Sequence, residues 1–353
     1  MVVGLIIVAL IVLVLPLRLR IVEHNLEPFF LLMGIIAVSI SGFWSVSLVI
    51  EALKAPVIIG SLPVGIFQVV LIIGIVIFYF NKPFYKIIIA IANKLGTKVF
   101  IFALILILGL VSSVISVILT AVILAEVIAA LPFPRPAKIK MVVVTCFAVG
   151  LGAVMTPLGE PLSTILVQKL SGEPYFAGFS FTTQHFAIYV VPGVVLLAVF
   201  GAFYVGRNLS LKAQESIPEY TETLRSVITR AIKVFIFVAA LVLLGEGLKP
   251  LIVWFFTGIP AWALYWINML SAVLDNATLT AIEIGPTLAL PQIISAIMAL
   301  LIAGGMLIPG NIPNIVAAGR LKISMKEWAV IGVPMGIILL AVYFAVLIPT
   351  FQF

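Results

Sequence analysis

The sequence has 353 residues, of which 64% are hydrophobic and 9% are charged, and its formal net charge is +7. Apolar runs of membrane-spanning length, roughly 20 residues, recur along the chain, and they are continuous and not alternating, which indicates α-helices in a membrane. The lone Cys146 excludes a disulfide framework and a Cys/His metal cluster. The basic excess is explained by membrane orientation and not by nucleic-acid binding. We expect an all-α polytopic membrane protein and not an enzyme.

The first apolar segment, MVVGLIIVALIVLVLPLRLR, lacks the basic start and the cleavage site of a signal peptide, so we expect a retained helix. Membrane helices are predicted in this part of the chain near residues 2–17, 29–50 and 63–80. The segment 81–98 carries Lys82, Lys86 and Lys94 around an apolar stripe. This pattern predicts an amphipathic helix at the cytoplasmic interface that braces the next segment. A short membrane span is the alternative.

Three blocks of sequence recur in the same order later in the chain. Residues 112–123 match 271–282, residues 152–165 match 304–316, and residues 179–205 match 321–348, with Pro192 falling on Pro334. The ordered set predicts an internal repeat of about 100 residues.

Each repeat begins with an apolar run that small and polar residues interrupt. The interrupting residues are Ser112, Ser113 and Ser116 in the first repeat, and Ser271, Asp275, Asn276 and Thr278 in the second. A second apolar run, 139–171 or 291–320, stops at TPLGEP or IPGNIP, where glycine and two prolines cannot continue a helix. A full helix, 184–206 or 328–349, closes the repeat. Paired discontinuous helices at membrane depth are typical of transporter binding sites.

The interrupted runs are interpreted as re-entrant hairpins, so that one helix near 231–248 inverts the second repeat relative to the first. This topology places seventeen basic residues on one side of the membrane and three on the other, which makes the first side cytoplasmic. Ordinary two-pass hairpins would scramble the two sides. We therefore expect a multi-pass protein of the cell (inner or plasma) membrane with both termini extracytoplasmic.

The predicted organisation has a first half, a linker and a second half. Residues 1–206 form the first half, with scaffold helices in 1–97 and the hairpin and broken helix in 98–206; residues 207–230 form a cytoplasmic linker, and residues 231–353 form the second, inverted repeat.

The motifs resemble those of the ion transporter superfamily, which includes divalent-anion/sodium symporters and NhaB- and NhaD-type sodium/proton antiporters. DNATLTA (275–281) resembles its Ser-Asn-Thr signature at a hairpin tip, and MTPLGEP (155–161) and LIPGNIPN (307–314) resemble its Thr-Pro-hydrophobic-Gly-x-Pro-x-Asn loops. The likeness covers the repeat cores, 98–206 and 250–350. It implies a homodimer with a scaffold and a moving transport domain, and cation sites where hairpin tips meet broken helices.

The resemblance implies two sets of site residues. The first is Ser113, Ser116, Thr156, Gly159 and Glu160, and the second is Asp275, Asn276, Thr278, Gly310, Asn311 and Asn314. The first set departs from the family pattern, with Ser116-Val117 where an Asn is expected and Ser163 in place of the terminal Asn.

The carboxylates decide the expected chemistry. Na⁺ prefers oxygen ligands, and a buried carboxyl group holds either a proton or a cation, so the two ions compete for one site. Asp275 is the first candidate for the shared ligand and Glu160 the second, with Asn276 as a further Na⁺ ligand. The alternatives are that Asp275 caps a helix, that Glu160 accepts from loop N–H groups, and that Asn311 and Asn314 only form turns. Glu126 and Glu283 are interpreted as ion-path or interhelical groups.

The sequence thus predicts a secondary active transporter, most simply a sodium (cation)/proton antiporter working by alternating access. Its partners would be a monovalent cation, a proton and membrane lipid, with no cofactor beyond bound Na⁺. The alternative is a sodium-coupled symporter of a small anion, a carboxylate or an oxyanion, although no Arg or Lys is predicted at midplane depth to attract one. A channel or a non-transporting membrane scaffold is a third hypothesis.

Overall fold

The computed structural model describes residues 1–23, 25–58, 66–115, 117–206, 223–256, 259–274 and 276–350. These ranges are helical and contain no β-strand. Five segments within them are long and apolar enough to cross a membrane: Thr97–Ile115, Arg135–Ala153, Phe181–Tyr204, Val227–Leu251 and Met325–Leu347. The chain therefore has the structure of an all-α, multi-pass membrane protein.

The N-terminal part forms helices α1 (Val2–Arg18), α2 (Arg20–Glu23), α3 (Leu26–Ser41), α4 (Val46–Lys54) and α5 (Ile66–Leu95). The prediction of one helix over 29–50 is wrong. Gly42 adopts a left-handed conformation, with φ of 76°, which ends α3, and the Ser45 hydroxyl accepts from the Leu48 N–H to cap α4. A non-helical residue, Phe80, kinks α5 where the predicted membrane helix gives way to the predicted interfacial one.

The first unit consists of α6 (Thr97–Ile115), α7 (Val117–Ala130), α8 (Arg135–Ala153), α9 (Pro161–Lys169) and α10 (Phe181–Tyr204). α6 and α8 run side by side in the same direction, and a Cβ atom at Gly152 would lie only 1.6 Å from the Gly109 oxygen. The Ser112 hydroxyl hydrogen-bonds to the oxygens of Gly109 (2.7 Å) and Val149 (3.1 Å) across this contact.

α7 runs back beside its neighbours. Lys138 donates to the Ala129 oxygen at 3.1 Å, which places the end of α7 next to the start of α8. The Lys98 ammonium lies over the Phe203 ring, and the Lys140 ammonium lies over the Tyr204 ring. The start of α6 and the end of α7 therefore lie at the same end of the molecule.

The second unit consists of α11 (Leu224–Phe256), α12 (Ala261–Ile267), η3 (Asn268–Ala272), α13 (Asn276–Glu283), α14 (Leu290–Gly304), η4 (Ile308–Gly310), α15 (Ile312–Leu321), α16 (Met325–Leu347) and η5 (Ile348–Thr350). α11 begins at Leu224, inside the range predicted as linker, and residues 207–222 of that range lie outside the described part. Asn268 donates to the Ala296 oxygen at 3.2 Å and Ser271 donates to the Leu300 oxygen at 3.3 Å. The segment α12–η3 thus runs parallel to α14, as α6 does to α8.

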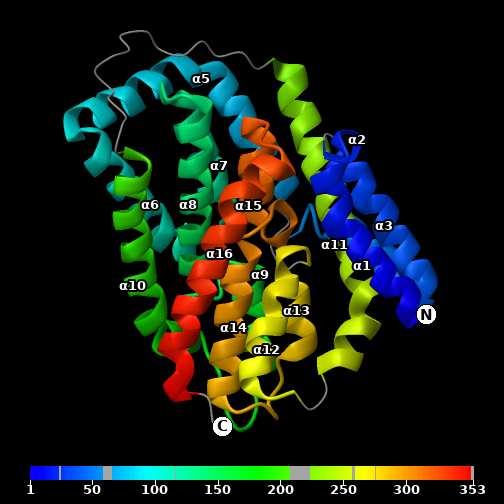
Figure 1. The fold of residues 1–353 in the computed structure, drawn as a ribbon. Helices are drawn as coiled ribbons and strands as arrows, with labels where there is room; N and C mark the ends of the chain where they lie inside the picture. Colours follow the sequence, from blue (N-terminus) through cyan, green and yellow to red (C-terminus); the bar gives the residue numbers. More distant parts are fainter. Residues whose placement is uncertain are drawn as a thin grey trace.

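The broken helices α8–α9 and α14–α15 run in opposite directions; in Figure 1, α9 lies below α8 whereas α15 lies above α14. At one end of the molecule, Arg135 at the start of α8 donates to the oxygens of Leu321 (3.4 Å) and Lys322 (2.7 Å) at the end of α15. Near the other end, the Tyr175 hydroxyl donates to the Leu288 oxygen, which joins the segment after α9 to the segment before α14.

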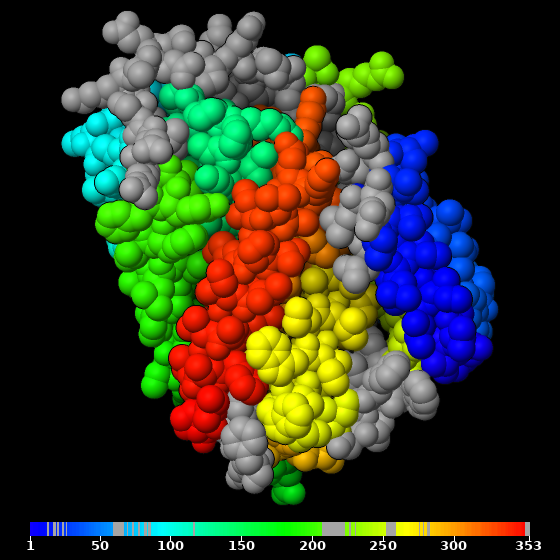
Figure 2. Space-filling model, in the orientation of Figure 1, coloured from blue at the N-terminus to red at the C-terminus, as the bar shows by residue number. Residues whose placement is uncertain are grey.

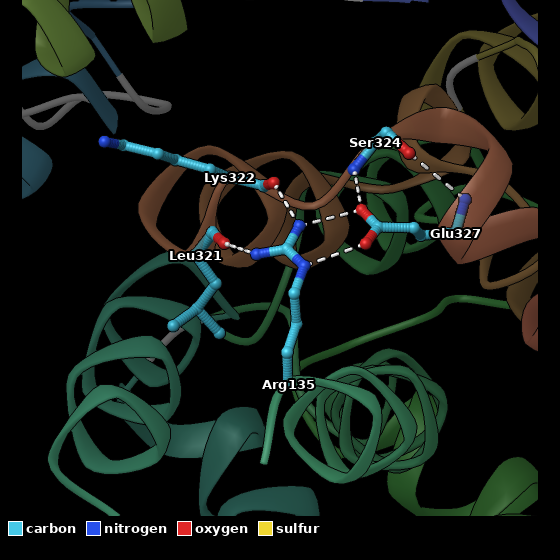
Figure 3. A network of polar contacts seen from close by, with 5 residues as sticks. All are labelled: Arg135, Leu321, Lys322, Ser324 and Glu327. Carbon is cyan, nitrogen blue, oxygen red and sulfur yellow. Dashed lines mark hydrogen bonds and ion pairs between the residues drawn. The ribbon is translucent and has the colours of Figure 1, made fainter. Parts of the chain in front are cut away.

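A capping box ties the first of these contacts together (Figure 3). α15 ends at Lys322, which is left-handed, and α16 begins with a box in which Ser324 and Glu327 cap each other. The same Glu327 carboxylate accepts two hydrogen bonds from the Arg135 guanidinium, both at 2.8 Å. The Glu327 side chain therefore both caps α16 and contacts the start of α8.

The interior is formed by the helices that precede the breaks. Residues 141–153 of α8 and 293–304 of α14 are buried without interruption. In Figure 2, α16 crosses the visible face between α10 and the yellow segment that contains α12. Its exposed apolar side chains, such as Val330 and Ile338, are typical of a surface in lipid.

Candidate cation-binding site

The first break lies between Ala153 and Pro161, as the sequence predicts, and α9 restarts at a proline, which is suited to the first position of a helix. The turn between α6 and α7, called the first tip below, contacts this break. The Thr156 hydroxyl donates to the Ser113 oxygen, and the Val117 N–H donates to the Gly159 oxygen at 2.7 Å. Three predicted site residues, Ser113, Thr156 and Gly159, are therefore brought together by tertiary contact.

Glu160 is the last residue of this break. It directly precedes α9 with extended backbone angles, φ of −153° and ψ of 159°, and it is only 4% exposed. The Ser163 hydroxyl, at the position where the resembled superfamily has an Asn, hydrogen-bonds to the backbone oxygens of Thr156 and Glu160, both at 2.8 Å. The break therefore holds a buried acidic residue, and Ser163 fixes the backbone carbonyl groups of Thr156 and Glu160.

The second break, between Gly304 and Ile312, repeats this geometry with an amide in place of the carboxyl. Asn311 has φ of −153° and ψ of 149°, close to the backbone angles of Glu160. Its side chain accepts from the Ile312 N–H at 2.8 Å. The Asn314 amide nitrogen donates to the Gly304 and Leu307 oxygens, both at 2.8 Å. Both asparagines therefore brace the turn. Whether they also bind a cation stays a prediction.

The tip between η3 and α13 meets the second break. A Cβ atom at Gly310 would lie 2.6 Å from the oxygens of both Ser271 and Gly304, so only glycine fits this close approach. Asn276 begins α13 and is 3% exposed, and its amide nitrogen has no hydrogen-bond partner in the described ranges. The same holds for the side-chain oxygen of Asn314.

Three predicted site residues cannot be compared with the structure in full. Ser116 and Asp275 lie outside the described residues, and the side chain of Thr278 does as well. The residues beside them in the sequence, Ile115, Val117, Leu274 and Asn276, are described.

The two breaks approach each other at the centre of the molecule. A Cβ atom at Gly150 of α8 would lie 3.0 Å from the Asn311 amide nitrogen, and one at Gly305 would lie 2.6 Å from the Phe147 ring. Among the described residues, no three His, Cys, Asp or Glu side chains gather to hold a metal ion. The oxygens at the breaks are instead mostly backbone and amide oxygens, which suit a hard monovalent cation.

An ion pair distant in sequence lies outside this site. Arg320 of α15 donates to both carboxylate oxygens of Glu126 on α7, at 2.6 and 3.0 Å, and both side chains are largely buried. This confirms the interhelical role predicted for Glu126. Asn268, which is fully buried, was not predicted as functional. Its only sequence signal is its place one helical turn before Ser271.

One protein family matches almost the whole chain. A family model described as a protein of unknown function, DUF1646, matches residues 2–349. The chain belongs to this family. No curated protein matches the DUF1646 chain, and the family description assigns no activity, so function has to be argued from the geometry.

Proposed function

We propose that this DUF1646 protein is a secondary active transporter that exchanges a monovalent cation, most simply Na⁺, for protons. The proposal includes the ion transporter superfamily architecture, with re-entrant hairpins α6–α7 and α12–α13 in inverted repeats and a cytoplasmic end that carries Arg135 and Arg320. It is supported by the parallel contacts of α6 with α8 and of α12–η3 with α14, and by the opposite directions of the two units.

The observation that carries the proposal is the buried Glu160 carboxyl in a helix break. A helix start attracts anions, but here the protein supplies the negative group itself, at a position buried in the core. A second carboxyl group, Asp275, follows Leu274 at the other tip in the sequence. A cation or a proton neutralises such groups, whereas a substrate anion would be repelled.

Alternating exposure of such a site to the two sides couples the two ions. When the cation leaves, the carboxyl group takes up a proton, because an ionised carboxylate without a partner costs several kcal/mol at membrane depth. The empty, charged site therefore does not cross, and exchange is obligatory. The bracing of both breaks by Ser163 and Asn314 keeps the carbonyl groups in place as the occupant changes.

The test uses the full-length protein in proteoliposomes that contain a pH-sensitive dye. An outward or inward Na⁺ gradient is expected to drive proton movement in the opposite direction. Asp275→Asn should abolish this movement and Glu160→Gln should strongly reduce it, because neither variant can release a proton at that position. Glu173→Gln, at an exposed position after α9, is the matched control and should retain the wild-type rate.

A binding measurement complements the transport assay. Na⁺ at 100 times its dissociation constant should raise the free energy of unfolding by about 2.7 kcal/mol if it binds only the folded state. This shift should appear for Na⁺ or Li⁺ in thermal unfolding and should shrink at low pH, where protons compete. Sodium-dependent stabilisation by a small carboxylate or oxyanion, with uptake and no proton counterflow, would refute exchange and establish the symporter.

A further inference from the structure

A buried polar stripe runs along one face of α13. Asn276, Thr280 and Glu283 are spaced four and three residues apart, which places them on the same side of a helix. Asn276 and Thr280 are buried, and both carboxylate oxygens of Glu283 are shielded from solvent. The Thr280 hydroxyl donates to the backbone oxygen of Asn276 at 2.8 Å. At helical rise, the stripe extends about 10 Å from the break towards the start of α14.

The carboxyl group at the end of this stripe lacks hydrogen-bond donors. Neither oxygen of Glu283 has a hydrogen-bond partner within the described ranges. The Asn268 side chain lies beside it, but its amide nitrogen is directed to the Ala296 oxygen, and its own side-chain oxygen has no partner. The three side-chain oxygens of Glu283 and Asn268 are therefore buried acceptors with no donor at hydrogen-bond distance among the described residues. A proton on the carboxyl group would supply that donor.

Among the described side chains on the helices packed against α13, none is hydrogen-bonded to Glu283, and Arg225 of α11 is exposed. α14 carries no charged residue, and Lys169 at the end of α9 is exposed. On α11, Lys249 pairs with Glu246 at 2.9 Å, and Lys233 pairs with Glu27 at 3.4 Å.

Glu160 begins α9 just as Asn276 begins α13, and these helices pack together. The Tyr175–Leu288 contact joins the segments that follow them, so the two helices run in the same direction. Glu160 therefore lies towards the opposite end of the stripe from Glu283, and its carboxyl group offers no positive charge.

We propose that Glu283 is a second proton-binding site, separate from the cation site at the helix breaks. In the conformation described, its carboxyl group is protonated and lies beside the Asn268 side chain. The Thr280 hydroxyl and the Asn276 amide continue the polar stripe towards the break, so that the Glu283 proton is relayed between the extracytoplasmic end and the cation site. The relay rests on the proposed cation/proton exchange, whereas the proton-binding site does not.

Infrared spectroscopy of the purified full-length protein tests the site without any gradient. At neutral pH, the wild type should show a carboxylic-acid C=O band that shifts in heavy water, and Glu283→Gln should remove its Glu283 component. Asn268→Ala should move this component to higher wavenumber without removing it, because the C=O group or its acid proton loses a partner. Glu173→Gln should leave the band unchanged. Size-exclusion chromatography of each variant establishes that the fold is intact.

The outcomes are distinct. A spectrum in which Glu283→Gln removes no protonated band shows an ionised Glu283 and overturns the site. A Glu283 band that disappears on addition of Na⁺ also overturns it, because the group would then be a cation ligand. In proteoliposomes, Glu283→Gln should abolish Na⁺-driven proton movement while Na⁺ stabilisation persists, and an unchanged rate overturns the relay. If the wild type exchanges no ions, the proposed function fails, while the infrared result still decides the site.

Discussion

Two of the contacts between the units pack the returning helix of one unit against the second half of the broken helix of the other: α7 on α15, and α13 on α9. In the α7–α15 contact, the Glu126 carboxylate accepts two hydrogen bonds from Arg320. In the α9–α13 contact, Glu283 has no hydrogen-bond partner among the described residues, and Lys169, which ends α9 as Arg320 nearly ends α15, is exposed.

The comparison shows that two similar backbone arrangements can hold a buried carboxyl group in different ways, one in an ion pair and the other without a charged partner among the described residues. A buried ion pair with good geometry holds two helices in register, and breaking it is costly because it strands a charge. A lone buried carboxyl group changes its charge whenever a proton comes or goes. We infer that the end of the molecule with Arg320 is fixed and that the end with Glu283 is responsive to protons.

The largest effect is expected from removing one partner of the ion pair. Arg320→Met should lower the free energy of unfolding by about 3–5 kcal/mol, because the Glu126 carboxylate would be left buried without its arginine. Unfolding curves in detergent measure this. The double variant Arg320→Met with Glu126→Leu should recover most of the loss. A double variant as unstable as the single one would show that packing, and not charge, decides this contact.

A smaller effect is expected at Gly159 and Gly310, the glycines at which the interrupted helices contact the hairpin tips. Gly310→Ala forces a methyl group to within 2.6 Å of two carbonyl oxygens, and such overpacking typically costs about 1–3 kcal/mol. Gly159→Ala, in the first break, faces the Ala153 oxygen at 1.9 Å and should cost a similar amount. Gly319→Ala is the control, since its Cβ atom would meet nothing within 4 Å. Thermal unfolding should rank the two break variants below the control.

Glu283→Gln should change the free energy of unfolding by no more than about 1 kcal/mol, because the amide keeps the shape and the donor of a protonated carboxyl group. The same change at Glu126 should be far more damaging, since it leaves Arg320 buried without its anion. Parallel denaturation of the two variants provides the comparison. Equal losses would remove the distinction between the contacts.

The smallest effect is expected at the exposed network of Figure 3. The side chains of Arg135 and Glu327 are 52% and 34% exposed, and such pairs contribute about 0.2–1 kcal/mol and weaken with salt. Arg135→Ala should therefore lower the melting temperature only slightly, and less at high NaCl concentration. A large effect that is insensitive to salt would indicate that the bonds to the Leu321 and Lys322 oxygens dominate.

The sequence by itself determined where the two broken helices stop and restart. The prolines and glycines of TPLGEP and IPGNIP cannot continue a helix, and the breaks between α8 and α9 and between α14 and α15 fall there. Local chemistry is sufficient for this, because ring geometry and missing N–H groups act within a few residues. The separation of α3 from α4 was missed, because a glycine inside an apolar run is also compatible with a continuous membrane helix.

Only the tertiary structure decided which polar groups have partners. Glu126 and Glu283 each lie on a short apolar helix that follows a hairpin tip. Nothing in the sequence around them predicts that Glu126 meets Arg320 or that Glu283 lies beside Asn268. These partners are set by the packing of α7 on α15 and of α13 against η3 and α14, between segments distant in sequence or separated by a turn. Burial and pairing depend on that packing, and they determine whether a carboxyl group is a fixed anion or an exchangeable one.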